Sequence, residues 1–295
     1  MQSTTLQYKL LKKVKDERFD EEKIHQYNLF LQIGVRDFQL AIIQSTDNRV
    51  LFLEDYVLPN TQTDEGLLEV LESIFDGHEI LKAGFWNQIK VSVKNNKFAQ
   101  VPDPLFVESA AGNYLQFNAD VDPEMDEISS IQNNRANAHT IFALRRDLKQ
   151  WLHHIYPSRQ IIFMHQSAAL IEEVMENAKD AKDNPLYTFI DRFKLHILSC
   201  KQNQLTYYNQ FTIKQFSDYV KYIMMVMKSL GMNQQTSEVV LWGYIGKNSP
   251  HYQEFYKYIS NVKFGDRPRH LHFGYMFDEI QDHHFFDLYG MHLIG

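Results

Sequence analysis

The chain has 295 residues and a mass of 34.9 kDa, which is enough for two domains of ordinary size or one large one. Hydrophobic residues make up 44% and charged residues 23%, and this composition excludes a disordered or low-complexity chain. A net charge of −7 argues against a dedicated nucleic-acid binder, which needs a basic face to meet phosphates. The single cysteine, Cys200, allows no internal disulfide and fits a reducing compartment.

Residues 1–26 are predicted to form a charged leader ahead of the domains. Basic residues between Lys9 and Lys15 are followed by acidic residues between Asp16 and Glu22. The segment lacks the apolar stretch of a signal peptide, and the most apolar helix candidate, around 219–230, is too short to cross a bilayer. We therefore expect a solvated leader, a cytoplasmic location and no insertion into a membrane.

Residues 27–180 are predicted to form a first subdomain that begins with an antiparallel meander. Apolar residues alternate along three segments, which is the period of a strand: 29–35, 38–44 and 50–58. A helix follows from an N-cap at Thr63 to a stop at Gly77.

Strand and helix patterns then alternate to the end of this subdomain. The expected strands are 89–93, 139–144 and 161–164, and the expected helices are 147–155 and 167–175. The polar segment 120–137 is interpreted as a surface loop, for which a partner contact is the alternative.

Residues 181–295 are predicted to form a second subdomain, which repeats the first, and a C-terminal tail. Its meander strands are 186–190, 193–200 and 205–211. Six positions correspond at a constant offset of 155 residues: Phe38, Leu40, Ile42, Asn48, Val50 and Phe52 with Phe193, Leu195, Ile197, Asn203, Leu205 and Tyr207. A polar hinge precedes the second strand of each meander, Arg36–Asp37 and Asp191–Arg192. Duplication explains this match better than chance does.

The second meander is followed by the same kinds of element as the first. Thr212 and Gln215 predict a capping box for a helix that ends at Gly231. A strand at 238–242 and a helix opened by Ser249 and Pro250 come next. Two β-β-β-α-β-α units predict an α/β protein with mixed sheets, and strand–helix pairs are inserted in the first unit.

Duplicated units of this kind resemble the actin-like ATPase fold, in which two ribonuclease H-like subdomains face a cleft. The local sequence also resembles an uncharacterised bacterial family, a domain of unknown function assigned to that fold. The resemblance extends over nearly the whole chain and rests on these segments: 31–33, 38–42, 101–102, 105–106, 114–118, 208–211, 218–220, Gly243 and 285–288. These segments carry the fold rather than the chemistry, so they support the architecture and not an activity.

The resemblance implies a nucleotide site whose motifs are damaged in this sequence. In active members, each hinge clasps phosphates with a carboxylate for Mg²⁺, a glycine and a hydroxyl. The first hinge keeps Gly34 but has Gln32 at the aspartate position and Val35 at the hydroxyl position. The second hinge has Asp191 and no glycine. The adenosine turn, residues 243–246, has Tyr244 in place of its second glycine.

These departures favour a non-catalytic binding or scaffold protein with a protein partner, no cofactor and no bound metal. The alternative is an ATP-dependent enzyme or switch of the same superfamily that binds Mg·ATP weakly through a rebuilt phosphate site. Six residues would form its nucleotide site: Gly34, Arg36, Asp191, Arg192, Gly243 and Gly246. The arginines would then face phosphates as cations.

Other candidate sites are set aside on their residue spacing. Cys200 ends an apolar strand and is interpreted as a buried small residue rather than a reactive thiolate. Five histidines lie in the last 26 residues, but none has the spacing of a known metal motif: His270, His272, His283, His284 and His292. We expect them to cap and pair on a polar surface.

Overall fold

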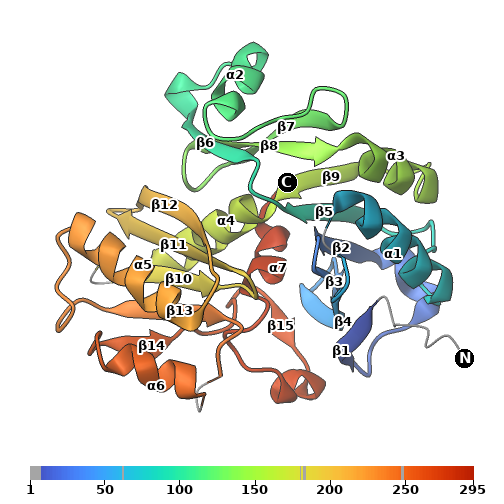
Figure 1. Ribbon diagram of the computed structural model, residues 1–295. Helices are drawn as coiled ribbons and strands as arrows, with labels where there is room; N and C mark the ends of the chain where they lie inside the picture. Colours follow the sequence, from blue (N-terminus) through green and yellow to red (C-terminus); the bar gives the residue numbers. More distant parts are fainter. Residues whose placement is uncertain (1–7, 62, 180, 182–183, 247–248) are drawn as a thin grey trace, which may run out of the picture.

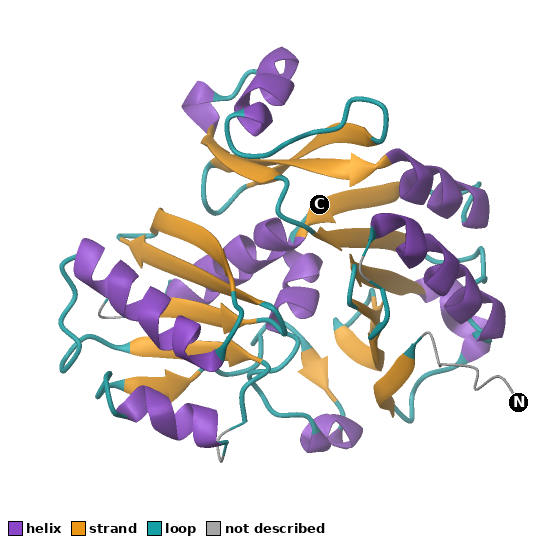
Figure 2. Cartoon of the chain, viewed as in Figure 1, coloured by secondary structure: helices purple, strands orange, loops and turns teal. Residues whose placement is uncertain are grey.

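Two mixed sheets with the same strand order form the body of the protein (Figure 1). The computed structural model describes residues 8–61, 63–179, 181, 184–246 and 249–295. Helices pack on the faces of both sheets (Figure 2), which makes the protein a mixed α/β structure, as the sequence predicts. Among the described residues, no helix is both long enough and apolar enough to span a membrane.

The first sheet is built on the first predicted meander. Its strands are β2 (Tyr27–Gly34), β3 (Asp37–Gln44), β4 (Arg49–Val57), β5 (Gln88–Lys94) and β9 (Ile161–His165). They lie in the order β4-β3-β2-β5-β9. The meander strands are antiparallel, whereas β5 and β9 continue the sheet parallel to β2.

The second sheet repeats this arrangement. Its strands are β10 (Leu186–Ile190), β11 (Lys194–Lys201), β12 (Gln204–Thr212), β13 (Val239–Gly243) and β14 (Val262–Phe264). The order β12-β11-β10-β13-β14 again places an antiparallel meander beside two parallel strands. The duplicated meander inferred from the offset of 155 residues is therefore present in the structure.

Helix ends follow the capping signals, with one shift. In α1 (Asp64–Gly77), the Thr63 side chain accepts a hydrogen bond from the backbone of Gly66, as predicted. In α5 (Phe216–Ser229), the N-cap is Gln215 rather than Thr212, and Asp218 completes the capping box. The prediction was wrong by three residues because Thr212 still belongs to strand β12. Two further helices are α3 (Arg146–Ile155) and α6 (Pro250–Tyr256), and Ser249 caps α6.

Helix α4 (Gln166–Ala178) lies between the two sheets and belongs to both cores. Ala168 and Ala169 pack into the core beside the first sheet. Leu170, Val174 and Met175 pack with residues of β10, β11 and β13. Because both sheets bury apolar surface on this one helix, it fixes their relative position.

A three-stranded antiparallel sheet, β6-β8-β7, is inserted between β5 and β9. Its strands are β6 (Phe98–Pro102), β7 (Asp126–Asn133) and β8 (Ala138–Arg145). Two 3-10 helices (Asp103–Leu105 and Glu108–Ala110) and α2 (Ala111–Gln116) lie between β6 and β7. Residues 98–145 are called the insert below. The expectation of a loop over 120–137 was wrong, because β7 pairs with β8 although its apolar residues, Ile128 and Ile131, do not alternate.

The N-terminal residues do not form the solvated leader that the charge pattern predicts. Strand β1 (Lys9–Lys15) pairs antiparallel with β4 and extends the first sheet, and Glu21–Gln26 form a 3-10 helix. Val14 is buried against the sheet, and Lys13 forms an ion pair of 2.9 Å with Glu54. Lysines on an edge strand remain solvated while the backbone pairs, which is why a charged segment can still be a strand.

The C-terminal residues follow the second sheet in sequence but join the first sheet in space. Strand β15 (His272–Phe273) pairs with β4. A 3-10 helix (Tyr275–Glu279), α7 (Phe286–Gly290) and a last 3-10 helix (Met291–Leu293) follow. Residues 271–295, called the tail below, pack their apolar side chains beside Phe30, Ala41 and Leu53 of the first sheet. Most apolar side chains of the tail therefore join the first sheet, whereas Phe286 stacks on Trp242 of the second sheet.

Candidate functional site

The two hinges face each other between the two sheets. Gly34 ends β2 at a place where a Cβ atom would lie 2.4 Å from Asp37 Oδ1, so any larger residue would have to displace the Asp37 carboxylate. The Arg36 guanidinium lies over the Phe193 ring, 4.5 Å from its centre. Asp37 Oδ2 lies 3.1 Å from Arg192 Nη1. The residues of each predicted hinge thus contact residues of the other hinge.

Lys94, at the end of β5, carries a positive charge into the space between the sheets. Its Nζ lies 2.8 Å from Asp37 Oδ2 and 3.5 Å from Asp191 Oδ2, and the side chain is only 4% exposed. Burial lowers the pKa of Lys94, but the carboxylates of Asp191 and Asp37 outweigh burial and hold that pKa above its ordinary value. Burial likewise raises the pKa of Asp191, but the Lys94 ammonium and the hydrogen bonds from Gln166 and the Arg192 backbone together outweigh burial and hold that pKa well below its ordinary value.

Arg192 forms a second cross-link between the sheets. Besides Asp37, its guanidinium binds Asp55 on β4. The same guanidinium lies over the ring of Tyr244, 4.3 Å from its centre, and the Tyr244 hydroxyl is hydrogen-bonded to Gln39. Gln39 also donates to Asp55 Oδ1 at 2.9 Å. Tyr244, which replaces a glycine of the adenosine turn, is therefore a structural partner of Arg192.

The tail contributes a fourth carboxylate, Asp287 of α7. Asp287 Oδ2 accepts hydrogen bonds from Gln32 Nε2 at 2.6 Å and from Gln166 Nε2 at 2.7 Å. Gln166 also donates to Asp191 Oδ2 at 3.0 Å. Burial raises the pKa of Asp287 above its ordinary value. Gln32, at the position where the resemblance to active actin-like ATPases implied an aspartate, thus connects the first sheet to the tail.

Together these side chains form what is called the hinge network below: Gln32, Asp37, Gln39, Asp55, Lys94, Gln166, Asp191, Arg192, Tyr244 and Asp287. Sequence reasoning identified Asp191 and Arg192 as site residues and missed Lys94, Asp55 and Asp287. The available signal for Lys94 was a lysine directly after an apolar strand.

The hinge network does not fit Mg·ATP as it stands. The carboxylates that could hold a hydrated Mg²⁺ are bound by Lys94 and Arg192. Gly243 has a φ of +98°, and a Cβ atom there would lie 2.1 Å from the Ile190 carbonyl oxygen, so packing against β10 explains this glycine. Within the described ranges, no group of three or more His, Cys, Asp or Glu side chains is arranged to bind a metal ion.

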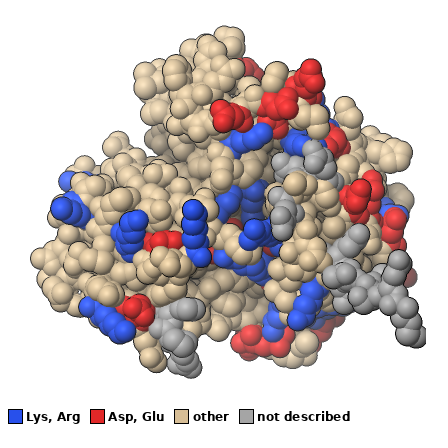
Figure 3. All heavy atoms as spheres, in the orientation of Figure 1, with Lys and Arg blue, Asp and Glu red and all other residues tan. Residues whose placement is uncertain are grey.

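Two open pockets lie beside the hinge network. One, of about 390 Å³, is lined by Gly34, Arg36, Lys97, Asp191 and Lys194 among others. Figure 3 shows Lys and Arg side chains gathered at the centre of this face of the molecule, between the parts built on the two sheets. Burial lowers the pKa of Lys194 to about 8, and its Nζ donates to the Asn95 carbonyl oxygen at 3.0 Å. This pocket, which Arg36, Lys97 and Lys194 line, is called the cationic pocket below.

The second pocket, of about 490 Å³, lies on the other side of Arg192 and is lined by Lys214, Phe216, Tyr244 and Gly246. Of the six predicted site residues, Gly34, Arg36 and Asp191 therefore line one pocket, and Arg192 and Gly246 line the other. Gly243 is buried in β13 and lines neither. The structure does not gather the six residues around one pocket.

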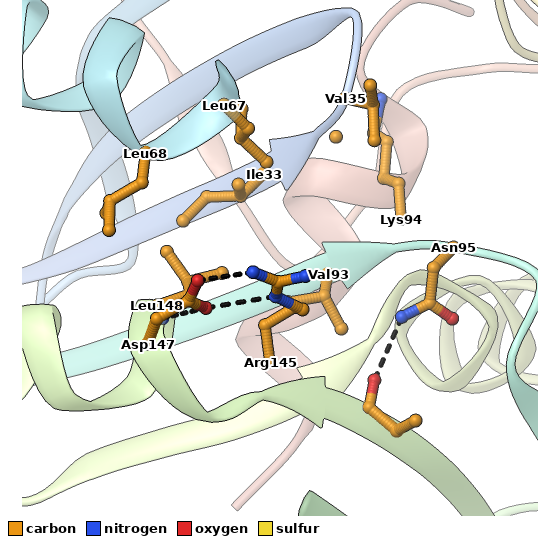
Figure 4. A pocket seen from close by; sticks show the side chains of 12 residues that line it. Ile33, Val35, Leu67, Leu68, Val93, Lys94, Asn95, Arg145, Asp147 and Leu148 are labelled. Atoms are coloured by element: carbon orange, nitrogen blue, oxygen red, sulfur yellow. Dashed lines mark hydrogen bonds and ion pairs between the residues drawn. The ribbon is translucent and has the colours of Figure 1, made fainter. Parts of the chain in front are cut away.

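A third, smaller pocket lies between α1 and the insert (Figure 4). Its volume is about 40 Å³, and aliphatic side chains from β2, α1, β5 and α3 line it: Ile33, Leu67, Leu68, Val93 and Leu148. Arg145 and Asp147 form an ion pair along one wall, and Asn95 Nδ2 donates to the Ala143 carbonyl oxygen at 2.9 Å. The pocket is large enough for little more than water.

The prediction that the five C-terminal histidines all lie on a polar surface was wrong. His283 is fully buried, and its Nε2 is hydrogen-bonded to the Ile245 carbonyl oxygen at 2.7 Å. The rings of His270 and His292 stack with their centres 5.4 Å apart. Burial lowers the pKa of both to about 4. Cys200 is buried, as predicted, and burial raises the pKa of its thiol to about 12.

Comparisons with known proteins agree with this architecture. A family model described as a protein of unknown function, DUF3822, matches residues 16–262. A search of curated proteins found no match. A solved protein of unknown function with an actin-like ATPase fold, from Bacteroides thetaiotaomicron VPI-5482, is similar with a TM-score of 0.75 and 21% identity over 84% of this chain and 93% of that one. The PilM–PilN type IV pilus biogenesis complex contains a chain that is similar with a TM-score of 0.61 and 10% identity over 90% of this chain and 97% of that one.

Proposed function

This chain belongs to the DUF3822 family of proteins of unknown function and has the actin-like ATPase fold, and from this premise we propose that it is a non-catalytic binding or scaffold protein. The hinge network is the observation that carries the proposal. Lys94 and Arg192 bind the carboxylates of both hinges, in the space where active members of the fold would hold phosphates and Mg²⁺. The cytoplasmic location expected from composition remains a prediction.

The buried ion pairs of the hinge network oppose the binding of a nucleotide. Lys94 and Arg192 lie among four carboxylates, Asp37, Asp55, Asp191 and Asp287, all of them buried. A triphosphate would add negative charge to this set and would compete for both cations. Removing one partner from a buried ion pair costs about 3–5 kcal/mol, because the other charge stays buried without compensation. Nucleotide binding would have to supply this energy in addition to its ordinary costs.

The proposal of a protein partner draws on the PilM–PilN complex. In that complex, a chain of similar fold is assembled with another protein of pilus biogenesis. This likeness concerns the fold, so it supports binding to a protein without identifying the partner. The structural role assigned to Tyr244 and Gln32 is consistent with a fold kept for its surfaces rather than for phosphate chemistry.

The alternative function, a nucleotide-dependent switch, has one observation in its favour. The cationic pocket of about 390 Å³ places Arg36 and Lys194 beside Gly34 and Asp191. Arginine and lysine bind phosphate well, so nucleotide could enter if Lys94 and Arg192 exchanged their carboxylates for phosphate oxygens. The thermal-unfolding experiment described next distinguishes the two functions.

The experiment is thermal unfolding with and without millimolar Mg·ATP, Mg·ADP and Mg·GTP. A non-catalytic scaffold predicts an unchanged Tm with every nucleotide. Ligand at 100 times its Kd would instead add about 2.7 kcal/mol of stability, which is a shift of a few degrees for a chain of this size. ATP hydrolysis measured on the same sample is expected to equal the rate without protein.

The control variants are Asp191→Ala, inside the hinge network, and Glu69→Ala, on the exposed surface of α1. A Tm increase with Mg·ATP that Glu69→Ala keeps and Asp191→Ala loses would overturn the scaffold proposal and establish the switch. An increase that both variants keep would place a nucleotide site elsewhere and would also contradict the proposal.

A further inference from the structure

Large apolar side chains of the insert are exposed to solvent. Phe117, directly after α2, is 88% exposed, Leu105 is 66% exposed and Val107 is 54% exposed. Figure 1 shows that α2 and its flanking turns project away from both main sheets. Clustered exposure of this kind in a folded protein marks a surface that another molecule covers.

Phe117 and Leu105 belong to one continuous face. The backbone of Phe117 is still helical, with φ −70° and ψ −19°, so its side chain neighbours that of Tyr114, three residues earlier. The Tyr114 hydroxyl in turn donates to the Leu105 carbonyl oxygen at 2.6 Å. Tyr114 and Phe106 also pack together, with ring centres 6.4 Å apart. This face, with Leu105, Val107, Tyr114 and Phe117, is called the insert face below.

The segment that carries the insert face has only one sign of charge. Residues 103–128 contain seven Asp and Glu residues and no Lys, Arg or His. Glu108, Asp120 and Glu124 are exposed, and none of the three forms an ion pair within the part of the chain that the structure describes. The acidic residues that are paired, such as Asp126 with Lys97, lie toward the body of the protein.

We propose that the insert face is the docking site for a basic amphipathic segment of a partner protein. Apolar side chains of that segment would cover Phe117 and Leu105, and its Lys or Arg residues would pair with Glu108, Asp120 and Glu124. This inference rests on the proposed function as a partner-binding protein and names the surface and the chemistry of the partner. Charge complementarity steers such an encounter and selects against acidic partners.

A different, basic protein is favoured over a second copy of this chain by the overall charge. Two copies with a net charge of −7 each repel one another as they approach. The most basic apolar segment of the chain itself, β1, already pairs Lys12, Lys13 and Lys15 with carboxylates of its own molecule. The insert face therefore has no ready counterpart on β1 of another copy.

The test measures binding of a fluorescein-labelled 18-residue peptide that carries Leu on one helical face and Lys on the other. A peptide with Glu in place of Lys is the charge control. We expect fluorescence anisotropy to show binding of the Lys peptide that weakens as salt rises, and at least about tenfold weaker binding of the Glu peptide. The double variant Leu105→Asp/Phe117→Asp should lose at least about tenfold in affinity for the Lys peptide.

The matched control is Phe85→Asp, which changes another exposed phenylalanine, 71% accessible and outside the insert. It should bind the Lys peptide like the wild type. Absence of binding to the wild type, or equal binding by the double variant, would overturn the proposal. Sedimentation in which the wild type forms dimers and the double variant stays monomeric would overturn it in favour of a second copy. These readouts are independent of nucleotide, so their failure leaves the Tm experiment to judge the proposed function.

Discussion

The two hinges occupy equivalent positions in the two copies of the fold, yet their charges stand in opposite order. The first hinge reads Arg36–Asp37 and the second reads Asp191–Arg192, with an offset of 155 residues. Asp37 and Arg192 are therefore equivalent residues of opposite charge, and they form an ion pair with each other. The cation of the second hinge is thus bound by the carboxylate of the first, whereas Arg36 lines the pocket beside them.

The half of the molecule built on the first sheet and the half built on the second sheet also differ in what has been added to the shared meander. The first sheet has gained β1, the insert and the paired strand β15 of the tail, whereas the second sheet keeps its five strands. The additions leave the insert face exposed on the first half, and the second half supplies Arg192 and Asp191 to the hinge network. Under the proposals above, the second half closes the nucleotide cleft and the first half presents the partner surface.

The largest expected effect comes from removing the Lys94 ammonium, which links the two halves. Lys94→Met removes the ammonium that binds Asp37 and Asp191 and leaves both carboxylates buried. We expect a loss of about 3–5 kcal/mol in the free energy of unfolding, measured by urea denaturation at pH 7. Lys94→Arg, which keeps the charge, should lose less.

Lys82→Met is the matched control, because Lys82 pairs with Asp76 on the surface and is half exposed. Exposed pairs contribute about 0–1 kcal/mol, so this variant should be nearly as stable as the wild type. Equal losses in the Lys94 and Lys82 variants would show that the hinge network does not hold the halves together.

The comparison between the halves was partly accessible from sequence. Alternating apolar residues predicted all six meander strands, because successive side chains of a strand point to opposite faces of the sheet. The offset of 155 residues then predicted that the two sheets share one topology. These signals lie within short segments or repeat along the chain, so they can be detected in a single sequence.

The elements that distinguish the halves lacked such signals. Strand β1 consists largely of lysines, β7 has no alternation, and β15 is two residues long. The hinge network joins Asp37, Lys94, Asp191 and Asp287, which are far apart in sequence and meet only when both sheets and the tail are assembled. Composition predicts neither the pairing of an edge strand nor the return of a tail to an earlier sheet.

A smaller effect is expected from weakening the tail. Leu288 is fully buried in the core that the tail shares with the first sheet. Leu288→Ala should lower the free energy of unfolding by about 2–3 kcal/mol, in the lower part of the range for such changes because a chain terminus can shift to fill space.

Hydrogen exchange locates the effect of the tail variant. If the tail belongs to the first half, amides of β3 and β4 should exchange faster in Leu288→Ala, and amides of β11 and β12 should change less. Tyr275→Ala, a change at an exposed residue of the tail, is the control and should alter neither set. A selective effect on β11 and β12 would instead assign the tail to the second half.

The smallest expected effect is a dependence of stability on pH that comes from the second meander and not from the first. His196 of β11 is fully buried, its Nδ1 lies 2.8 Å from the Tyr208 hydroxyl, and the equivalent residue of the first meander is Ala41. Burial lowers the pKa of His196 to about 3. Below pH 6.5 the unfolded chain therefore binds a proton that the folded chain does not, and stability falls as pH falls.

His196→Ala makes the second meander like the first at this position and should remove that dependence. Removal of the hydrogen bond to Tyr208 lowers stability at every pH, so the slope and not the absolute value is compared. Between pH 6 and pH 5, urea denaturation should show the wild type losing about 1.2 kcal/mol more than the variant. Parallel curves would mean that His196 is already protonated in the folded state, held by the nearby Asp191 carboxylate, and that the buried charge of the hinge network extends into β11.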